Sequence, residues 1–253
     1  MMRGNNPMHG TRTDTISRRR FLTGSAAAAG ITLSGCASVG NDTGAQPRFG
    51  DLRFPRFRGQ QSPERVATPS KRQYAQIYGP LPDEEFPIPA IDIDKVPEQF
   101  WRREVAYTGG EAPRTDVVDT STFYLYHVGD GGSAMRYGVG LGRQGFAWSG
   151  RAVIAWKRKW PTWTPPDEMI ARKPELEKYS VRNGGMAPGL NNPLGARALY
   201  IHQNGVDTLY RVHGTPEYWT IGKAVSSGCV RMMNQDVVHL YEHVRNGSPI
   251  LVR

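Results

Sequence analysis

Beyond Arg114 the chain is built of short apolar runs separated by turn residues, and this texture favours a β-rich fold over a helical one. Strands are expected at 115–119, 122–128, 135–140, 152–156, 197–203, 208–212 and 250–252. One helix is expected after Asn234, a good N-cap residue, and Gly247 can close it. Because no parallel β-α-β rhythm is present, we expect a mainly β, mostly antiparallel domain with a few short helices.

The first 36 residues have the pattern of an export signal. Three consecutive arginines from Arg18 stand before an uncharged stretch, 23–33, that is too short and too weakly apolar to span a bilayer. This arrangement resembles the twin-arginine signal, so we expect a location in the periplasm or cell envelope. Leu33-Ser34-Gly35-Cys36 resembles the lipobox of bacterial lipoproteins, which would anchor the protein to a membrane through lipid on Cys36. The alternative is an ordinary signal cleaved near Ala37.

Residues 37–112 are rich in Pro, Arg, Gly and Gln, which is the composition of a tether. Apolar residues punctuate its later part, among them Phe86, Ile88 and Trp101. We therefore expect 37–80 to be flexible and 81–112 to pack on the domain that follows. The chain thus divides into a signal at 1–36, a tether at 37–112 and a folded domain at 113–253.

Charge and cysteine content exclude one class of partner and leave one question open. The formal net charge is +9, but residues 1–36 hold five of the 32 basic residues and one of the 23 acidic ones. No basic patch interleaved with stacking aromatics is found, and export removes the chain from nucleic acid. The two cysteines, Cys36 and Cys229, could form a disulfide. Each also has a separate explanation, because Cys36 falls in the lipobox and Cys229 in the motif described next.

His213 and Cys229 form a candidate catalytic pair, since both stand at the ends of expected elements and can meet in space. An adjacent imidazole makes a thiol nucleophilic by accepting its proton, and it can return that proton to a leaving amine. Gly228 leaves room for a substrate carbonyl, with the N–H groups of Gly228 and Cys229 available to the oxyanion. Arg231 could hold a substrate carboxylate. Spacing alone favours a catalytic cysteine no more than a buried structural one.

The wider motif resembles one enzyme family. His213-Gly214-Thr215, Ile221-Gly222 and Ser226-x-Gly228-Cys229-Val230-Arg231-Met232 are similar to the motif of the L,D-transpeptidase (YkuD) catalytic-domain family. Asn192-Pro193-Leu194-Gly195 and Asp236 with Leu240-Tyr241 fit the same pattern. The resemblance implies a mixed β-sandwich or barrel with a few short helices. It also implies an L,D-transpeptidase that needs no metal and no other cofactor.

The same resemblance implies a role for each residue of the site. Cys229 would attack the L,D peptide bond of a peptidoglycan stem tetrapeptide and form an acyl-enzyme, with His213 as base and the Gly214 carbonyl orienting the imidazole. Arg231 would hold the substrate carboxylate, and Ser226, Ser227 and Gly228 would line the same loop. The acyl group would pass to an amine, either of another stem peptide in a 3-3 cross-link or of an outer-membrane protein.

Two other functions stay open on the sequence alone. Water could release the acyl group, which would make the protein an L,D-carboxypeptidase or an amidase. The domain could also be a non-catalytic peptidoglycan-binding lipoprotein, although binding alone needs neither His213 nor Cys229.

Several other histidines and tryptophans have structural interpretations. No third ligand at metal-binding spacing accompanies the histidines, so we expect packing rather than a metal site at His127, His202, His239 and His243. Three tryptophans could stack on glycan, cap the site or simply pack: Trp156, Trp160 and Trp163. The segment 177–192, rich in Gly and Pro, is a candidate lid.

Overall fold

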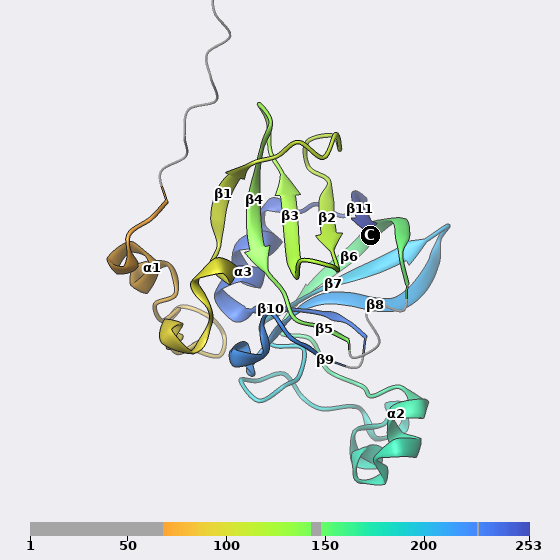
Figure 1. Ribbon diagram of the computed structural model, residues 1–253. Helices are drawn as coiled ribbons and strands as arrows, with labels where there is room; N and C mark the ends of the chain where they lie inside the picture. Colours follow the sequence, from red (N-terminus) through yellow and green to blue (C-terminus); the bar gives the residue numbers. More distant parts are fainter. Residues whose placement is uncertain (1–67, 143–147, 227) are drawn as a thin grey trace, which may run out of the picture. The chain divides into compact units, whose positions relative to one another are not determined.

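The computed structural model describes residues 68–253 apart from 143–147 and 227, and its main element is a twisted nine-stranded sheet (Figure 1). The strands follow one another across the sheet in the order β1 (Arg103–Ala106), β4 (Ser133–Gly138), β3 (Tyr124–Val128), β2 (Asp116–Asp119), β11 (Ser248–Val252), β6 (Gly150–Lys159), β7 (Arg197–Gln203), β8 (Val206–Thr215) and β10 (Val230–Met233). Neighbours pair antiparallel except β2 with β11 and β8 with β10, which are parallel. A separate parallel pair joins β5 (Leu141–Gly142) and β9 (Ala224–Ser226).

The helices of the described residues are short. The α-helices are α1 (Lys71–Ile77), α2 (Asp167–Arg172) and α3 (Asn234–His243), and the 3-10 turns are Ile93–Lys95, Glu98–Phe100, Pro174–Tyr179, Val181–Asn183 and Tyr218–Thr220. The expected fold class, mainly β with a few short helices, is confirmed. The parallel pairs were not expected. The chain leaves β8 and returns parallel to it through a 3-10 turn and β9, without the crossover helix that would show as a β-α-β pattern.

One hydrophobic core packs strands from both halves of the sheet against α3. Leu125 and Tyr137 come from β3 and β4, Leu199 and Val212 come from β7 and β8, and Leu240 comes from α3. Each of these side chains is at most 1% exposed. Full burial of such a side chain contributes about 1.5–3 kcal/mol relative to leaving it in water. The strands that carry the candidate site therefore rest on a rigid apolar layer.

The ends of α3 differ from the sequence prediction. Asn234 is the first helical residue rather than the N-cap, which is Met233 without a side-chain bond. Instead, the Asn234 side chain accepts a hydrogen bond of 3.0 Å from the backbone N–H of Ala196. The helix ends at His243 with Val244 as its C-cap, and Gly247, with φ of 85°, lies in the turn before β11. Asn234 is thus used for a tertiary contact, which local capping rules do not foresee.

Packing of the N-terminal segment begins earlier than the sequence suggested. A capping box between Ser70 and Gln73 starts α1. Tyr74 and Tyr78 are buried in a second cluster that also contains Met233 at the start of α3. Residues from α1 onward are therefore docked, about ten positions before the boundary expected at 81. Whether the chain divides functionally at 36 and 112 stays a prediction.

Glu84 ties this segment to β7. Its carboxylate accepts two hydrogen bonds from Arg197, at 2.8 and 2.5 Å, and a third of 3.0 Å from the indole N–H of Trp160. Arg197 is only 1% exposed, so its charge is stabilised mainly by this bidentate pair. The pair also keeps the pKa of Glu84 below its usual value despite burial.

Replacement of Glu84 by Ala should lower the free energy of unfolding by about 3 kcal/mol, because it leaves Arg197 as a buried charge without its counterion. Urea denaturation followed by circular dichroism measures the change. The neighbouring Glu85 is exposed, and Glu85→Ala is the matched control, for which a change below about 0.5 kcal/mol is expected. Equal destabilisation by both variants would contradict the importance of the pair.

Candidate active site

The parallel pairing of β10 with β8 brings Cys229 and His213 to one face of the sheet. Val230 pairs with Val212, and Arg231 pairs with His213. Cys229 immediately precedes β10, so in the same register it lies beside Arg211 and diagonally opposite His213. Side chains two residues apart on a strand point the same way, which puts Cys229 and Arg231 on the face of His213. This register is what brings the expected pair, His213 and Cys229, to the same face of the sheet.

His213 is held as a neutral base. Its side chain is buried, and its Nδ1 lies 2.6 Å from the backbone carbonyl oxygen of Gly214. A carbonyl oxygen only accepts, so Nδ1 carries the proton and Nε2 is left as the basic nitrogen. Burial lowers the pKa of His213 to about 4, and the nearby charges of Arg231 and Arg211 act in the same direction. The imidazole is therefore uncharged at neutral pH and ready to accept a proton.

Cys229 is partly buried and is not in a disulfide among the described residues. Burial raises the pKa of its thiol, while a hydrogen bond from the backbone of Arg211 and the charges of Arg211 and Arg231 oppose that rise. The resting pair is consequently a neutral thiol beside a neutral imidazole. Charge would appear only when the proton moves from sulfur to nitrogen, and the two arginines would then stabilise the thiolate.

The backbone around the pair depends on glycine. Gly228 has a φ of 134°, a conformation that L side chains rarely adopt, and it precedes Cys229 directly. A Cβ on Gly214 or on Gly195 would collide with the Asn234 side chain. Asn234 thus packs between two glycine backbones while it bonds Ala196, and it fixes the strand end that carries His213. Sequence analysis missed this role.

Arg231 already has an anionic partner. Its Nη1 lies 2.8 Å from a carboxylate oxygen of Glu217, whose side chain is 51% exposed. The backbone of Arg231 is fixed by two hydrogen bonds with Gly140, of 2.8 and 2.9 Å. The Arg231 guanidinium is therefore paired with a carboxylate that is half exposed to solvent. The sequence singled out Arg231 and gave no sign of Glu217.

The remaining predicted site residues are placed only in part. Ser226 is the last residue of β9 and pairs with Gly142 of β5, so its backbone lies beside the site strand. Ser227 and the proposed lipid-bearing Cys36 lie outside the described residues. No described helix is long and apolar enough to cross a membrane.

The connection from β6 to β7 is anchored by Asn192. This side chain is buried, and its amide donates to the carbonyls of Pro161, Met186 and Ala187 at 3.0, 3.2 and 3.0 Å. Trp160 is also buried and bonds Glu84, so it belongs to the fold rather than to a substrate surface. The motif that starts at Asn192 therefore fixes the long connection. A lid function for 177–192 stays a prediction.

Two of the histidines that were expected to pack lie on α3 and contact other side chains. His239 and His243 on α3 stack at a centroid distance of 4.4 Å, and the hydroxyl of Tyr137 lies 2.8 Å from Nδ1 of His239. Within the described part of the chain no group of three His, Cys, Asp or Glu side chains is arranged to hold a metal ion.

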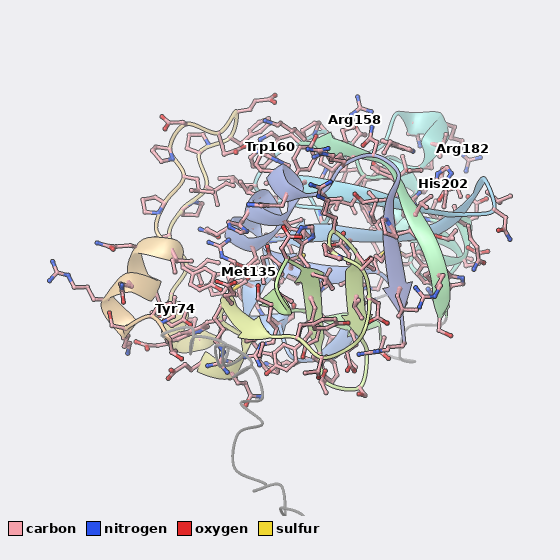
Figure 2. The ribbon with its side chains drawn as sticks, turned by 90° about the horizontal axis from the view of Figure 1, so that it is seen from above. Tyr74, Met135, Arg158, Trp160, Arg182 and His202 are labelled. Atoms are coloured by element: carbon pink, nitrogen blue, oxygen red, sulfur yellow. The ribbon has the colours of Figure 1, made fainter. Side chains whose placement is uncertain are left out.

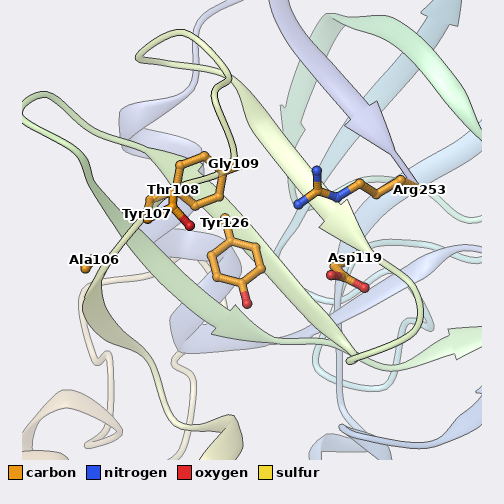
Figure 3. A pocket seen from close by; sticks show the side chains of 7 residues that line it. All are labelled: Ala106, Tyr107, Thr108, Gly109, Asp119, Tyr126 and Arg253. Atoms are coloured by element: carbon orange, nitrogen blue, oxygen red, sulfur yellow. The ribbon is translucent and has the colours of Figure 1, made fainter.

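A pocket of about 190 Å³ lies elsewhere, against the outer side of β2 and β3 (Figure 3). Tyr107, Asp119, Tyr126 and Arg253 are among the residues that line it. It contains neither Cys229 nor His213, so it is separate from the candidate site.

Comparison with known proteins identifies the family. The model of the YkuD family, the L,D-transpeptidase catalytic domain, matches residues 113–252. The probable L,D-transpeptidase ErfK/SrfK of Escherichia coli is 30% identical over 144 residues, which are 54% of this chain and 43% of that protein. The putative L,D-transpeptidase YqjB of Bacillus subtilis is 37% identical over 83 residues, 32% of this chain and 45% of that protein. The matched segment thus spans less than half the length of either relative.

Solved structures are also similar to this chain, although their TM-scores are below 0.5. A Brucella melitensis structure described as a probable carnitine operon oxidoreductase is 41% identical over 61% of this chain and 94% of that chain, with a TM-score of 0.44. An L,D-transpeptidase from Mycobacterium smegmatis is 21% identical over 60% of this chain and 67% of that chain, with a TM-score of 0.38. The assignment rests on the family model, which covers more than half of the sequence. The chain belongs to the L,D-transpeptidase (YkuD) catalytic-domain family.

Proposed function

We propose that the protein is a peptidoglycan L,D-transpeptidase of the cell envelope that forms an acyl-enzyme on Cys229 and transfers the acyl group to an amine. The observation that carries the proposal is the hydrogen bond from His213 Nδ1 to the Gly214 carbonyl, in a strand paired with the one that follows Cys229. It leaves Nε2 as the base on the face that Cys229 shares. A protein that only binds peptidoglycan would not need an oriented imidazole beside a thiol.

In the first half-reaction His213 Nε2 takes the thiol proton while the sulfur attacks the carbonyl carbon of the L,D peptide bond. The tetrahedral intermediate collapses, the C–N bond breaks, and the imidazolium returns the proton to the leaving amine of the terminal D-residue. A thioester on Cys229 remains. In the second half-reaction an acceptor amine attacks the thioester and His213 removes its proton. The C–S bond breaks, the Cys229 thiolate leaves, and the imidazolium of His213 returns the proton to it.

The negative charge that develops on the carbonyl oxygen needs donors close to Cys229. The backbone N–H groups of Gly228 and Cys229 are suited to this role because they adjoin the sulfur, and the φ of 134° at Gly228 is a conformation that glycine adopts readily. A donor of this kind supplies roughly 3–4 kcal/mol of transition-state stabilisation. Gly228 therefore serves both backbone geometry and catalysis in this proposal.

Arg231 is proposed to bind the terminal carboxylate of the donor stem. Its guanidinium lies on the face of His213, and its partner Glu217 is half-exposed. Because the Glu217 end of this ion pair is half in solvent, screening by water weakens the pair, and a substrate carboxylate would compete with Glu217 for the guanidinium. In the absence of substrate, the Glu217 carboxylate would hold the Arg231 guanidinium in its binding orientation.

Product analysis tests the reaction. Purified protein incubated with disaccharide-tetrapeptide muropeptides should yield cross-linked dimers by transfer to an amine, separated by chromatography and weighed by mass spectrometry. A carbapenem should add its mass to the wild-type protein at Cys229, and Cys229→Ser should show neither activity. Shortened stems in place of dimers would indicate hydrolysis, and unchanged muropeptides would indicate a binding protein.

The pH dependence of acylation tests the neutral pair. Protonated imidazole cannot accept the thiol proton, and the pKa of His213 is lowered to about 4, so the wild-type rate of carbapenem acylation should fall only near pH 4. His213→Ala should be slower at neutral pH by roughly 10²–10⁴. Its rate should then rise with pH, because burial raises the pKa of the unaided Cys229 thiol. Identical profiles for the two proteins would remove His213 from the mechanism.

Glu217→Gln should lower the KM for the tetrapeptide donor by up to about fivefold and leave kcat unchanged, since it removes the carboxylate that competes for Arg231. Arg231→Gln should raise the same KM. Initial rates at increasing donor concentration separate the two parameters. A higher KM for Glu217→Gln would mean that Glu217 itself binds the substrate.

A further inference from the structure

A row of stacked side chains leads from the candidate nucleophile across the sheet. Tyr200 on β7 pairs with Arg211 on β8, and the Arg211 guanidinium lies 4.4 Å from the centroid of the Tyr200 ring. On the other side, the Trp156 ring of β6 stacks on Tyr200 with a centroid distance of 3.4 Å and an interplanar angle of 12°. Arg211 is also the residue whose backbone contacts the Cys229 thiol. The stacked row therefore begins at Arg211, the neighbour of Cys229, and ends at Trp156.

The inner part of this row is fixed. Asp207 binds the Arg211 guanidinium with both oxygens, at 2.7 and 2.8 Å, and Arg211 also donates to the carbonyl of Tyr210 at 2.9 Å. Such a bidentate pair holds a guanidinium in one orientation. The Arg211 guanidinium is thus paired with Asp207, and it stacks on the Tyr200 ring, which also stacks against Trp156.

The outer end of the row is open. Trp156 is 37% exposed although Tyr200 stacks on one face of its indole, so the exposed area lies on the remaining side. Arg158 is two residues further along β6 and points to the same side, and it is exposed. Figure 2 shows Arg158 at the periphery of the molecule. The open face of Trp156 and the guanidinium of Arg158 are therefore both accessible to a ligand on the same side of β6.

The distance from Cys229 to Trp156 is only a few ångströms longer than the donor stem, a gap of the size of the bond between stem and sugar. Three strand steps separate β10 from β6 in the sheet (Figure 1), and neighbouring strands lie about 4.8 Å apart, which gives about 14 Å. The three stem residues before the attacked bond span about 10 Å when extended. A stem that runs across the strands from Cys229 would bring the sugar to which it is attached to Trp156.

We propose that Trp156, backed by Tyr200 and flanked by Arg158, is a subsite for the sugar ring that carries the donor stem. The inference rests on the proposed function and adds a second recognition point to it. The apolar C–H face of a pyranose ring would stack on the open face of the indole. Arg158 would donate to the hydroxyl, acetamido or carboxylate oxygens around that ring. The enzyme would then distinguish a stem on glycan from a free peptide.

The test compares two donors that differ only in the sugar, the disaccharide-tetrapeptide and the free tetrapeptide. Trp156→Ala should lower kcat/KM for the disaccharide-tetrapeptide about two- to tenfold and leave the free tetrapeptide unchanged. Trp156→Phe, which keeps an aromatic face, should recover most of the loss. Val153→Ala, at another exposed apolar residue of the same strand, is the matched control and should affect neither donor.

Equal losses on both donors, or no loss on either, would overturn the subsite. Binding separates this outcome from failure of the proposed reaction. If wild-type protein turns over neither donor, the transpeptidase proposal fails. Calorimetric titration of the disaccharide-tetrapeptide into the Cys229→Ala protein would then still decide the subsite, since weaker binding after Trp156→Ala supports it and equal binding rejects it.

Discussion

The parallel pairing of β8 with β10 is the constraint on which the rest of the site depends. One register places His213 beside Arg231 and brings the residue before β10, Cys229, onto the same face. Because side chains alternate along a strand, a slip of one position would turn Cys229 to the opposite face. Asn234 opposes such a slip, since it lies where Gly195 and Gly214 have no side chain and bonds the backbone of Ala196.

Burial decides the electrostatics of the pair. It lowers the pKa of His213 and raises that of Cys229, so both effects disfavour a thiolate–imidazolium pair in the resting protein. Arg211 and Arg231 lie where they favour negative charge on the sulfur. The side chains of His213 and Cys229 are thus both uncharged in the resting protein. A neutral Cys229 thiol is less open to oxidation, because oxidants react with the thiolate.

The sequence predicted what depends on local pattern and missed what depends on distant contacts. Alternating apolar runs gave the β-rich class and the approximate strands, and the motif around His213 and Cys229 gave the family, which the family model confirms. The parallel partners of β2 and β8 could not be predicted, since pairing between separated strands leaves no mark in either one. Asn234 was expected to cap a helix, and Glu217 was not expected at all, because their partners are remote in sequence. The export signal, Cys36 and the roles of the site residues stay predictions.

The hydrogen bonds between Glu84 and Arg197 show that the folded unit of this chain begins before the segment matched by the family model. The match to the family model begins at residue 113, whereas the carboxylate that neutralises a buried arginine of β7 comes from residue 84. Arg197 adjoins Ala198, the strand partner of His213. The unit that folds is therefore larger than the segment that the family model matches, and its extra part is connected to the backbone next to the strand partner of His213.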